Sequence, residues 1–545
     1  MGRFLGSQDD SERHAYIDET WMEVIAAKLN AMSMITRRRF LANGLLAAGA
    51  FQTGSLFAAP NVPSVVVRAP SGALRGESVD GVRVFRGVPF AEPPVGSLRF
   101  LPTVRVNPWK GERDATKFSA APMQRKLLTV PHSEDCLYLN IWAPEGSGPF
   151  PVFVWIHGGG FTDGYAFEPT YDGTDFAREG IISISVEYRL GVFGFLDFEP
   201  ILGEQYAGTA NNGLHDVMTA LSWIQENIGA FGGDPARVTI GGESAGAKLT
   251  DILMGIPSAQ PLFHQMISES GGAERVWDRP TSAGITRGFA DIWQKQSGDA
   301  IASVKTAAGA SLIQAQQEFL DTWPQHFPLR AEIDGSFIPR LPVETIAGGS
   351  TRGKRLLIGT NREESAIFIG PHPKKDATAM QLGNTSVAKF DAVYQKYKEI
   401  YPQLSVEQRR IRAVTAEEYW VPSIRVAEAH LKGGGRAYVY ELEFAETSGK
   451  FAGDAYHSLD VGMIWNHPHK QVADAASEAA LGKQMHAAWA AFIRGETPAA
   501  PGLPAWPQYD EQNRSTMIFG AKASAESRVE QGPQAAELAL WKETL

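Results

Sequence analysis

The chain contains a single cysteine, Cys136, among its 545 residues, so it cannot form a disulfide bond within itself. Metal sites built from several cysteines are excluded for the same reason. The histidines show no HExxH spacing, and His467 and His469 form only an HxH pair, which is more often part of a surface loop than a ligand set. The composition therefore gives no indication of a metal centre.

Long runs of one charge sign are also missing. The net charge is -10, with lysine and arginine spread along the chain. A nucleic-acid-binding surface requires clustered basic residues, so we expect no nucleic-acid partner. With 43% hydrophobic and 21% charged residues, the composition is that of a globular protein long enough to bury a large core.

A long uninterrupted apolar run, as a membrane span requires, is absent from the N-terminal segment. Its apolar stretch runs from Leu41 to Ala50 and then meets polar residues and glycines, whereas a span needs roughly 20 apolar residues. The residues just before it read TRRRF at 36–40, and small residues follow at Ala58 and Ala59. This pattern is typical of a twin-arginine export signal cleaved near Ala59; the alternative is an uncleaved membrane anchor.

The domain organisation follows from this signal. Residues 1–31 precede Met32 and Met34 and are interpreted as a start-site extension, residues 32–58 as the signal segment, and residues 59–545 as one mature domain. We expect a periplasmic or secreted protein without stable membrane insertion. The sequence does not indicate an oligomeric state.

From residue 64 onward, strand-like and helix-like stretches alternate without an internal repeat, which favours one α/β domain with a doubly wound sheet. An opening hairpin is predicted from 65–68 and 82–85, with turns at 71–72 and 80–81. A helix is predicted at 213–228. Buried strands are predicted at 151–156, 181–186, 238–241, 266–268, 356–359 and 437–442.

A GxSxG pentapeptide, GESAG, spans residues 242–246 with Ser244 at its centre. It follows a predicted strand and precedes a helix-like run at 247–254. In that position it is typical of a nucleophile elbow, because small flanking residues permit the strained turn that raises the serine hydroxyl above the sheet. The N-terminus of the following helix adds partial positive charge where an oxyanion would form. The sequence therefore predicts Ser244 as a nucleophile.

A second glycine-rich loop, HGGGF at 157–161, follows the strand predicted at 151–156. Attack by a serine on a carbonyl needs N–H donors for the developing oxyanion, and glycines let backbone amides turn into a pocket. A plain flexible turn is the alternative, but it accounts poorly for three consecutive glycines between a buried strand and an aromatic residue. We interpret the loop as part of an oxyanion hole.

Four further blocks accompany these two motifs, at 85–94 (FRGVPFAEPP), 133–140 (SEDCLYLN), 188–191 (YRLG) and 231–235 (FGGDP). Together with 157–161 (HGGGF) and 242–246 (GESAG), they resemble the type-B carboxylesterase family, to which cholinesterases and bacterial para-nitrobenzyl esterases belong. The resemblance extends from about residue 65 to residue 509. It implies an α/β-hydrolase fold, with a large mostly parallel sheet flanked by helices and with inserted helical segments around the active-site gorge. It also implies a serine carboxylesterase that hydrolyses small-molecule esters through an acyl-enzyme, with neither a metal nor an organic cofactor.

The resemblance also assigns the catalytic residues. The acid follows the strand predicted at 356–359, where Glu364, the second acid of a pair, is the triad member and Glu363 is the alternative. The base is His457, which follows the last predicted strand in the order serine, acid, histidine. The oxyanion donors are the amides of Gly159, Gly160 and Ala245.

Glu243, next to the nucleophile, has two open interpretations: it tunes the electrostatics of the site, or it is a structural partner. Lys248 stands where the family usually has a small or polar residue, one turn into the helix after Ser244. Either it pairs with a buried acid such as Asp251, which we prefer, or it reaches a substrate carboxylate. The resemblance further predicts an ion pair between Arg99 and Glu134.

Two departures from the family concern the segment before Cys136. Met123 replaces the cysteine to which Cys136 is commonly bonded, so Cys136 is predicted to be a buried free thiol. The loop at Arg125 and Lys126 lacks the tryptophan with which cholinesterases bind a quaternary ammonium, which makes a choline ester an unsuitable substrate. Those two cations could meet an anionic substrate, although a solvated loop tip is the preferred interpretation.

The main alternative class is a binding protein on an inactive esterase scaffold. Such proteins typically lack the nucleophile, whereas Ser244, Glu364, His457 and the glycine loop are all present here. A lipase would need a hydrophobic lid that the sequence does not reveal, while an amidase would share every residue named. We therefore expect an ester hydrolase.

Overall fold

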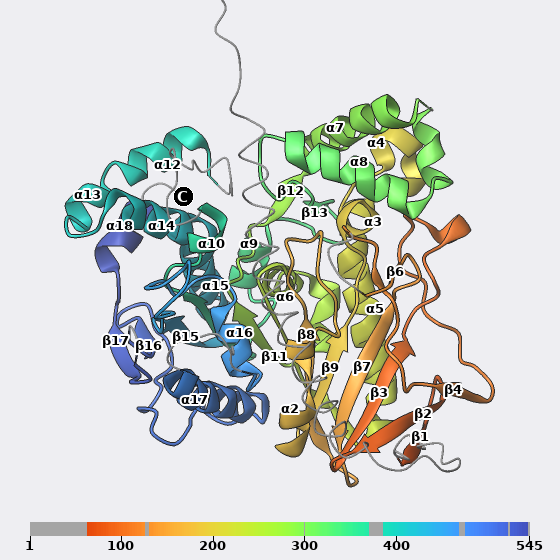
Figure 1. Ribbon diagram of the computed structural model, residues 1–545, viewed down its shortest axis with the longest axis horizontal. Coiled ribbons are helices and arrows are strands. Elements are labelled where there is room, and N and C mark those ends of the chain that lie inside the picture. The colour runs from red at the N-terminus through yellow and green to blue at the C-terminus, as the bar shows by residue number, and fades with distance from the viewer. Residues whose placement is uncertain are drawn as a thin grey trace, which may run out of the picture. The chain divides into compact units, whose positions relative to one another are not determined.

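A large mixed sheet runs through the protein, with helices on both of its faces (Figure 1). The computed structural model describes residues 63–125, 130–298, 300–369, 385–467, 475–521 and 524–542. By their contacts, Pro63–Leu545 form one compact unit. The start-site extension and signal segment predicted at 1–58 lie outside the described residues, as do Lys126 and His469.

The main sheet has the strand order β1-β2-β3-β7-β9-β8-β10-β11-β14-β15-β16-β17, with β4 beside β2. Neighbours from β9 to β16 are parallel, and the other neighbours in this order are antiparallel. Strand β4 pairs parallel with β2. Two short pairs, β5 with β6 and β12 with β13, lie outside it. The strands are β1 (Ser64–Ala69), β2 (Gly72–Val79), β3 (Val82–Pro89), β4 (Glu112–Asp114), β5 (Ala121–Pro122), β6 (His132–Ser133), β7 (Tyr138–Pro144), β8 (Phe150–Ile156), β9 (Ile182–Val186), β10 (Gly233–Glu243), β11 (Gln265–Glu269), β12 (Val276–Asp278), β13 (Ala331–Ile333), β14 (Arg355–Asn361), β15 (Arg436–Leu442), β16 (Ser515–Phe519) and β17 (Arg528–Gln531).

Helices connect the strands and form insertions. The pair α7 and α8 packs together, and α13 contacts α12, α14 and α18 (Figure 1). Within the described residues, no helix is both long and apolar enough to cross a lipid bilayer. The helices are α2 (Thr174–Arg178), α3 (Gly191–Gly194), α4 (Glu199–Leu202), α5 (Asn212–Asn227), α6 (Ala245–Met254), α7 (Arg279–Ser297), α8 (Gly309–Thr322), α9 (Pro342–Ala347), α10 (Ala366–Ile369), α12 (Val387–Tyr394), α13 (Tyr397–Ile400), α14 (Val406–Thr415), the π-helix η8 (Ala416–Trp420), α15 (Val421–Lys432), α16 (Leu459–Ile464), α17 (Ala475–Ile493) and α18 (Ala535–Lys542).

The central strand β8 shows why the sheet is covered on both sides. Side chains alternate between the two faces of a strand, and every residue from 151 to 156 is buried. On one face, Phe153 packs 5.3 Å from Phe176 of α2, and Trp155 packs 5.3 Å from Trp465, measured between ring centroids. On the other face, Val154 belongs to the core that includes residues of α5 and α6. The apolar side chains of β8 on both faces therefore match its burial on both sides.

The strands and the helix predicted from the sequence match observed elements, with one correction at the N-terminal end. The predicted hairpin of 65–68 with 82–85 is wrong, because β2 lies between these two strands and pairs antiparallel with both. The predicted turn at 80–81 is correct, and the one predicted at 71–72 lies one residue earlier, at 70–71, because Gly72 begins β2. Each turn joins one pair of a three-stranded meander. Polar residues Arg75, Glu77 and Ser78 along β2 weakened its apolar pattern.

Candidate active site

The predicted catalytic residues follow the carboxyl ends of strands in the parallel part of the sheet. The glycine loop follows β8, Ser244 follows β10, Glu364 follows β14 and His457 lies in the connection after β15. Of these strands, β8 and β10 are direct neighbours, as are β14 and β15, and β11 joins the two pairs. Parallel strands present their carboxyl ends at one edge, where α/β proteins bind ligands.

Ser244 occupies a strained turn between β10 and α6. Its backbone has φ 56° and ψ -122°, a conformation that costs free energy for a residue with a side chain. The turn is held because the Ser244 amide donates to the carbonyl oxygen of Glu269 at 2.9 Å. Close packing also requires glycine at 246, where a Cβ atom would lie 1.9 Å from the carbonyl oxygen of Ile156. This geometry is that of a nucleophile elbow.

His457 and Glu364 form a buried pair. Nδ1 of His457 lies 2.5 Å from Oε2 of Glu364. The other carboxylate oxygen, Oε1, accepts hydrogen bonds from the backbone amide of Asn361 at 2.8 Å and from the hydroxyl of Ser270. Burial raises the pKa of Glu364 to about 7, and the hydrogen bond from Ser270 opposes that rise. A carboxylate held in this way fixes the orientation and tautomer of the imidazole.

The alternative acid, Glu363, points elsewhere. Its Oε2 accepts a hydrogen bond from the backbone amide of Ala455 at 3.0 Å, and its Oε1 lies 3.9 Å from Arg362. Of the two acids at this turn, Glu364 is therefore the one that contacts the imidazole of His457.

The glycine loop presents unused amide donors beside Ser244. Gly159 has φ 115° and Gly160 has φ 62°, backbone conformations that glycine adopts readily. The loop is fixed by the amides of Thr162 and Asp163, which both donate to the carbonyl oxygen of Gly159. In the described part of the chain, no protein acceptor takes the amide hydrogens of Gly159, Gly160 or Ala245. The loop thus offers donors of the kind that bind an oxyanion.

The comparisons with known proteins agree with this geometry. The model of the carboxylesterase family matches residues 63–541. The chain belongs to the carboxylesterase family. It is a serine carboxylesterase, a hydrolase of carboxylic esters, with the α/β-hydrolase fold.

Several relatives of this carboxylesterase are similar over nearly their whole length. A para-nitrobenzyl esterase of Bacillus subtilis is 31% identical, over 85% of this chain and 96% of its own. A fumonisin B1 esterase of Sphingopyxis macrogoltabida is 30% identical, over 85% of this chain and 88% of its own. The crystal structure of a Geobacillus stearothermophilus carboxylesterase superposes with a TM-score of 0.77 at 32% identity, covering 87% of this chain and 99% of that one.

Glu243 faces the second nitrogen of the catalytic histidine. Its Oε1 lies 3.2 Å from Nε2 of His457 and accepts a hydrogen bond from Ser458 Oγ at 2.6 Å. Burial raises the pKa of Glu243 to about 7, while the nearby imidazole opposes that rise. The carboxylate of Glu243 and Cβ of Ser244 both lie against Gly158, where an added Cβ would be 2.8 Å and 3.1 Å from them. Glu243 therefore lies beside both the nucleophile and the imidazole of the carboxylesterase.

Lys248 is buried and pairs with a buried acid, as predicted, but that acid is Glu418 and not Asp251. Nζ of Lys248 lies 3.6 Å from Oε1 of Glu418 and donates to the backbone carbonyls of Ser270 and Gly271 at 3.3 and 3.2 Å. Asp251 instead accepts hydrogen bonds from Ser268 Oγ and the amide of Gly272. Proximity along one helix suggested Asp251, whereas the true partner lies 170 residues later, on η8.

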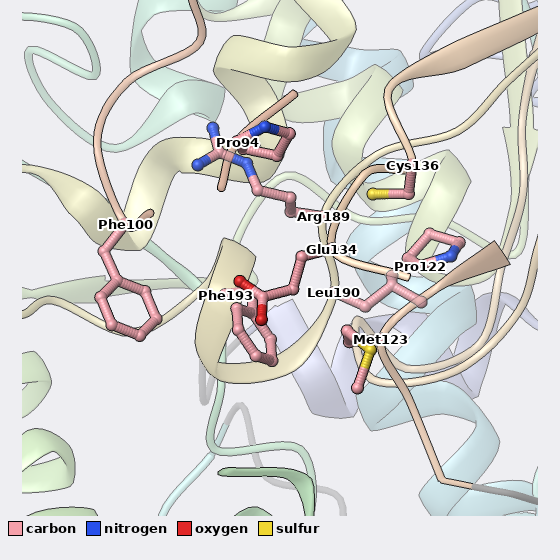
Figure 2. A pocket seen from close by; sticks show the side chains of 9 residues that line it. All are labelled: Pro94, Phe100, Pro122, Met123, Glu134, Cys136, Arg189, Leu190 and Phe193. Atoms are coloured by element: carbon pink, nitrogen blue, oxygen red, sulfur yellow. The ribbon is translucent and has the colours of Figure 1, made fainter. Parts of the chain in front are cut away.

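Cys136 is placed as predicted, whereas Arg125 is half-buried and paired and is not at a solvated loop tip. Cys136 is a buried free cysteine, and burial raises the pKa of its thiol. Figure 2 shows that Cys136 and Met123 line the same pocket. Glu134, also in this pocket, accepts a hydrogen bond from Arg99 Nε at 2.7 Å, which confirms the predicted ion pair. Arg125 lies 3.4 Å from Asp163 and is paired within the protein.

Three groups around the triad were missed by the sequence analysis. Ser270, which follows β11, donates a hydrogen bond to Glu364. Strand β11 pairs with β14, the strand before Glu364, so residues that follow these two strands meet at one edge of the sheet. Tyr419 and Phe368 pack on the ring of His457, with centroids 4.7 and 5.3 Å away. Both aromatic residues come from helical segments with no sequence motif, so only the fold brings them to the site.

Proposed function

We propose that this carboxylesterase cleaves small to medium carboxylic esters with Ser244 as nucleophile, His457 as base and Glu364 as its orienting acid. The observation that carries the proposal is the 2.5 Å contact of Glu364 with His457 Nδ1, in a site where Ser244 sits on a strained elbow. With Nδ1 bound to the carboxylate, Nε2 is the nitrogen that can accept the serine proton.

In the first half-reaction, Ser244 attacks the ester carbonyl while His457 Nε2 takes its hydroxyl proton. The amides of Gly159, Gly160 and Ala245 donate to the oxyanion that forms. The tetrahedral intermediate then expels the alcohol, which receives the proton from His457, and leaves an acyl-enzyme. A water activated by the same histidine attacks the acyl-enzyme, releases the acid and regenerates Ser244.

Glu243 acts on this cycle through charge. Its carboxyl group lies 3.2 Å from His457 Nε2, so an ionised Glu243 stabilises the imidazolium that forms during each attack. Its raised pKa, about 7, means that it gains this charge near neutral pH.

The proposed location is the periplasm or the cell exterior, reached through the twin-arginine signal at 32–58. Arg37 and Arg38 with the apolar run after them support this proposal. Replacing both arginines by lysine should retain the enzyme in the cytoplasm. Active enzyme outside the cytoplasm of a strain that makes the double variant would contradict the proposed export route.

The catalytic proposal is tested with p-nitrophenyl acetate, butyrate and octanoate, using protein that begins at Ala59 and the same protein with Ser244→Ala. We expect turnover by the first and only background hydrolysis by the second. The preferred chain length then reports the size of the acyl pocket. Equal rates in both proteins would refute the role of Ser244, and no turnover in either would favour a binding protein on this scaffold.

A further inference from the structure

Aromatic side chains separate the triad from a buried cluster of charges. Tyr419 packs on the His457 ring at 4.7 Å. Phe327 packs against the glycine loop at 157–161, because a Cβ atom added to Gly160 would come 2.6 Å from the ring of Phe327. Phe368 joins the two, with its centroid 6.3 Å from that of Tyr419 and 6.1 Å from that of Phe327. These three rings, the aromatic wall, lie against the catalytic imidazole and the glycine loop.

Arg275 lies directly behind the aromatic wall. Its guanidinium carbon is 5.7 Å from the centroid of Phe327, and the residue is 2% exposed. One of its nitrogens, Nη2, forms an ion pair with Oε1 of Glu418. The other two, Nε and Nη1, are buried and meet no hydrogen-bond acceptor among the described residues. Unused donors on a buried guanidinium are costly, which makes Arg275 an unusual group to keep beside an active site.

Glu418 is shared between two cations, and Glu417 is a second acid whose charge stabilises the guanidinium of Arg275. The same Glu418 oxygen, Oε1, also faces Nζ of Lys248 at 3.6 Å. Lys248 is itself buried, with its Nζ 4.4 Å from the centroid of Tyr419. A further cation, Arg330, lies 4.0 Å over Trp277 and donates from Nε to the carbonyl oxygen of Phe327. The wall is therefore backed by cations on the side of Phe327 and of Tyr419.

We propose that Nε and Nη1 of Arg275 bind a carboxylate on the acyl part of the substrate, so that the enzyme prefers half-esters of dicarboxylic acids. The proposal rests on the catalytic function proposed above. The leaving oxygen must face His457, and the carbonyl oxygen must face the oxyanion loop. The acyl chain is then directed along Phe327, toward Arg275.

The chemistry of the group fits this ligand. A guanidinium presents paired N–H donors in a plane that matches a carboxylate, and such charge-assisted pairs are strong when they are shielded from water. The ring of Phe327 stands between Arg275 and Gly160. The acyl chain of the substrate must therefore carry its carboxylate several carbons beyond the ester carbonyl. The Phe327 side chain must also rotate to let this carboxylate reach Arg275. A neutral acyl chain of the same length would leave the two donors unpaired.

The test compares two p-nitrophenyl esters, the monoester of adipic acid and the heptanoate, whose acyl chains have nearly the same length. In the wild-type enzyme we expect kcat/KM for the anionic ester to exceed that for the neutral one. In Arg275→Met, the ratio of the two should fall about ten- to a hundredfold, as expected for a lost hydrogen bond to a charged group. Arg275→Lys should retain part of the preference.

Two controls keep the outcomes distinct. Arg99→Met removes an arginine from another ion pair, with Glu134, and should leave the ratio unchanged. Turnover of the heptanoate in each variant reports that the enzyme is folded and that its triad works. Efficient hydrolysis of the heptanoate with strong discrimination against the adipate monoester, or a ratio unaffected by Arg275→Met, would overturn the carboxylate site. If the wild-type enzyme hydrolyses neither ester, that result would instead overturn the catalytic proposal.

Discussion

Replacing Glu364 by glutamine should remove most of the activity while preserving the shape of the site. The carboxylate accepts at both oxygens: Oε2 from His457 Nδ1 at 2.5 Å, and Oε1 from Ser270 and from the backbone amide of Asn361 at 2.8 Å. Glutamine offers only one acceptor oxygen, and its other position is an N–H donor.

The fixed amide of Asn361 decides how that glutamine would lie. The backbone N–H of Asn361 cannot turn away. The glutamine must therefore place its amide oxygen at the Oε1 position, because its NH₂ group there would face the N–H of Asn361. The NH₂ group then faces His457 Nδ1, which must give up its proton. The imidazole is left with its proton on Nε2, the nitrogen that should receive the proton of Ser244. A tautomer error of this kind lowers kcat on the order of 10⁴-fold, or about 5 kcal/mol.

The assay is kcat/KM for p-nitrophenyl butyrate, with Glu363→Gln as the matched control. Glu363 lies next in sequence but bonds the amide of Ala455, so its loss should change the rate only a few-fold. Circular dichroism and the urea midpoint should show that both variants are folded. The reasoning is refuted if Glu363→Gln loses as much activity as Glu364→Gln, or if Glu364→Gln retains near wild-type kcat.

Three further predictions concern the elbow, the acid and the C-terminal helix. Gly246→Ala should lower the free energy of unfolding by about 1–3 kcal/mol through overpacking, whereas Gly229→Ala, whose Cβ would meet no atom within 4 Å, should leave the urea midpoint unchanged. Activity requires ionised Glu364, whose pKa is about 7, so kcat/KM should fall as the pH drops below about 7. Ser270→Ala removes a hydrogen bond that lowers the pKa of Glu364, so the acidic limb of the pH–activity profile should move to higher pH. Glu537 accepts from two tyrosine hydroxyls and one arginine, and Glu537→Ala should destabilise the fold by about 3–5 kcal/mol in urea titrations.

Each of these predictions has a contrary result. Equal urea midpoints for Gly246→Ala and the wild type would show that the elbow can relax around a methyl group. An acidic limb that stays fixed or moves to lower pH in Ser270→Ala would mean that Glu364 does not control it. An unchanged midpoint for Glu537→Ala would show that the network around α18 adds nothing to stability.

The parallel centre of the fold could be predicted because its strands are buried on both faces. The run at 151–156 is apolar without interruption and is followed at once by the glycine loop. Strand β2 could not be found in this way, since arginine, glutamate and serine side chains interrupt its apolar residues. The apolar pattern therefore revealed the strands that protein covers on both faces, and it missed one strand near the edge of the sheet.

For the site, the order of motifs after predicted strands identified the candidate catalytic residues, whereas closeness along the chain gave the wrong partner for Lys248. Ser244 and the glycine loop stand at the ends of apolar strands, where motif and context coincide. The partner of Lys248 was assigned to Asp251 because that residue is close along the chain, yet Glu418 reaches it from a distant helix. Arg275 and Glu418 carry no motif. Only the contacts of Arg275 with Phe327 and Glu418, and of the neighbouring Tyr419 with His457, connect them to the site.

The π-helix η8 lies between α14 and α15 and supplies both Glu418 and Tyr419. A π-helical turn holds one more residue than an α-helical one, so it is an insertion absorbed without breaking the helix. Deleting one residue there would return the segment to α-helix while the flanking helices keep their places. It would move Tyr419 from His457 and Glu418 from Arg275 together. A single insertion or deletion, with no substitution at the triad, would thus be enough for related enzymes to diverge in the substrates they accept.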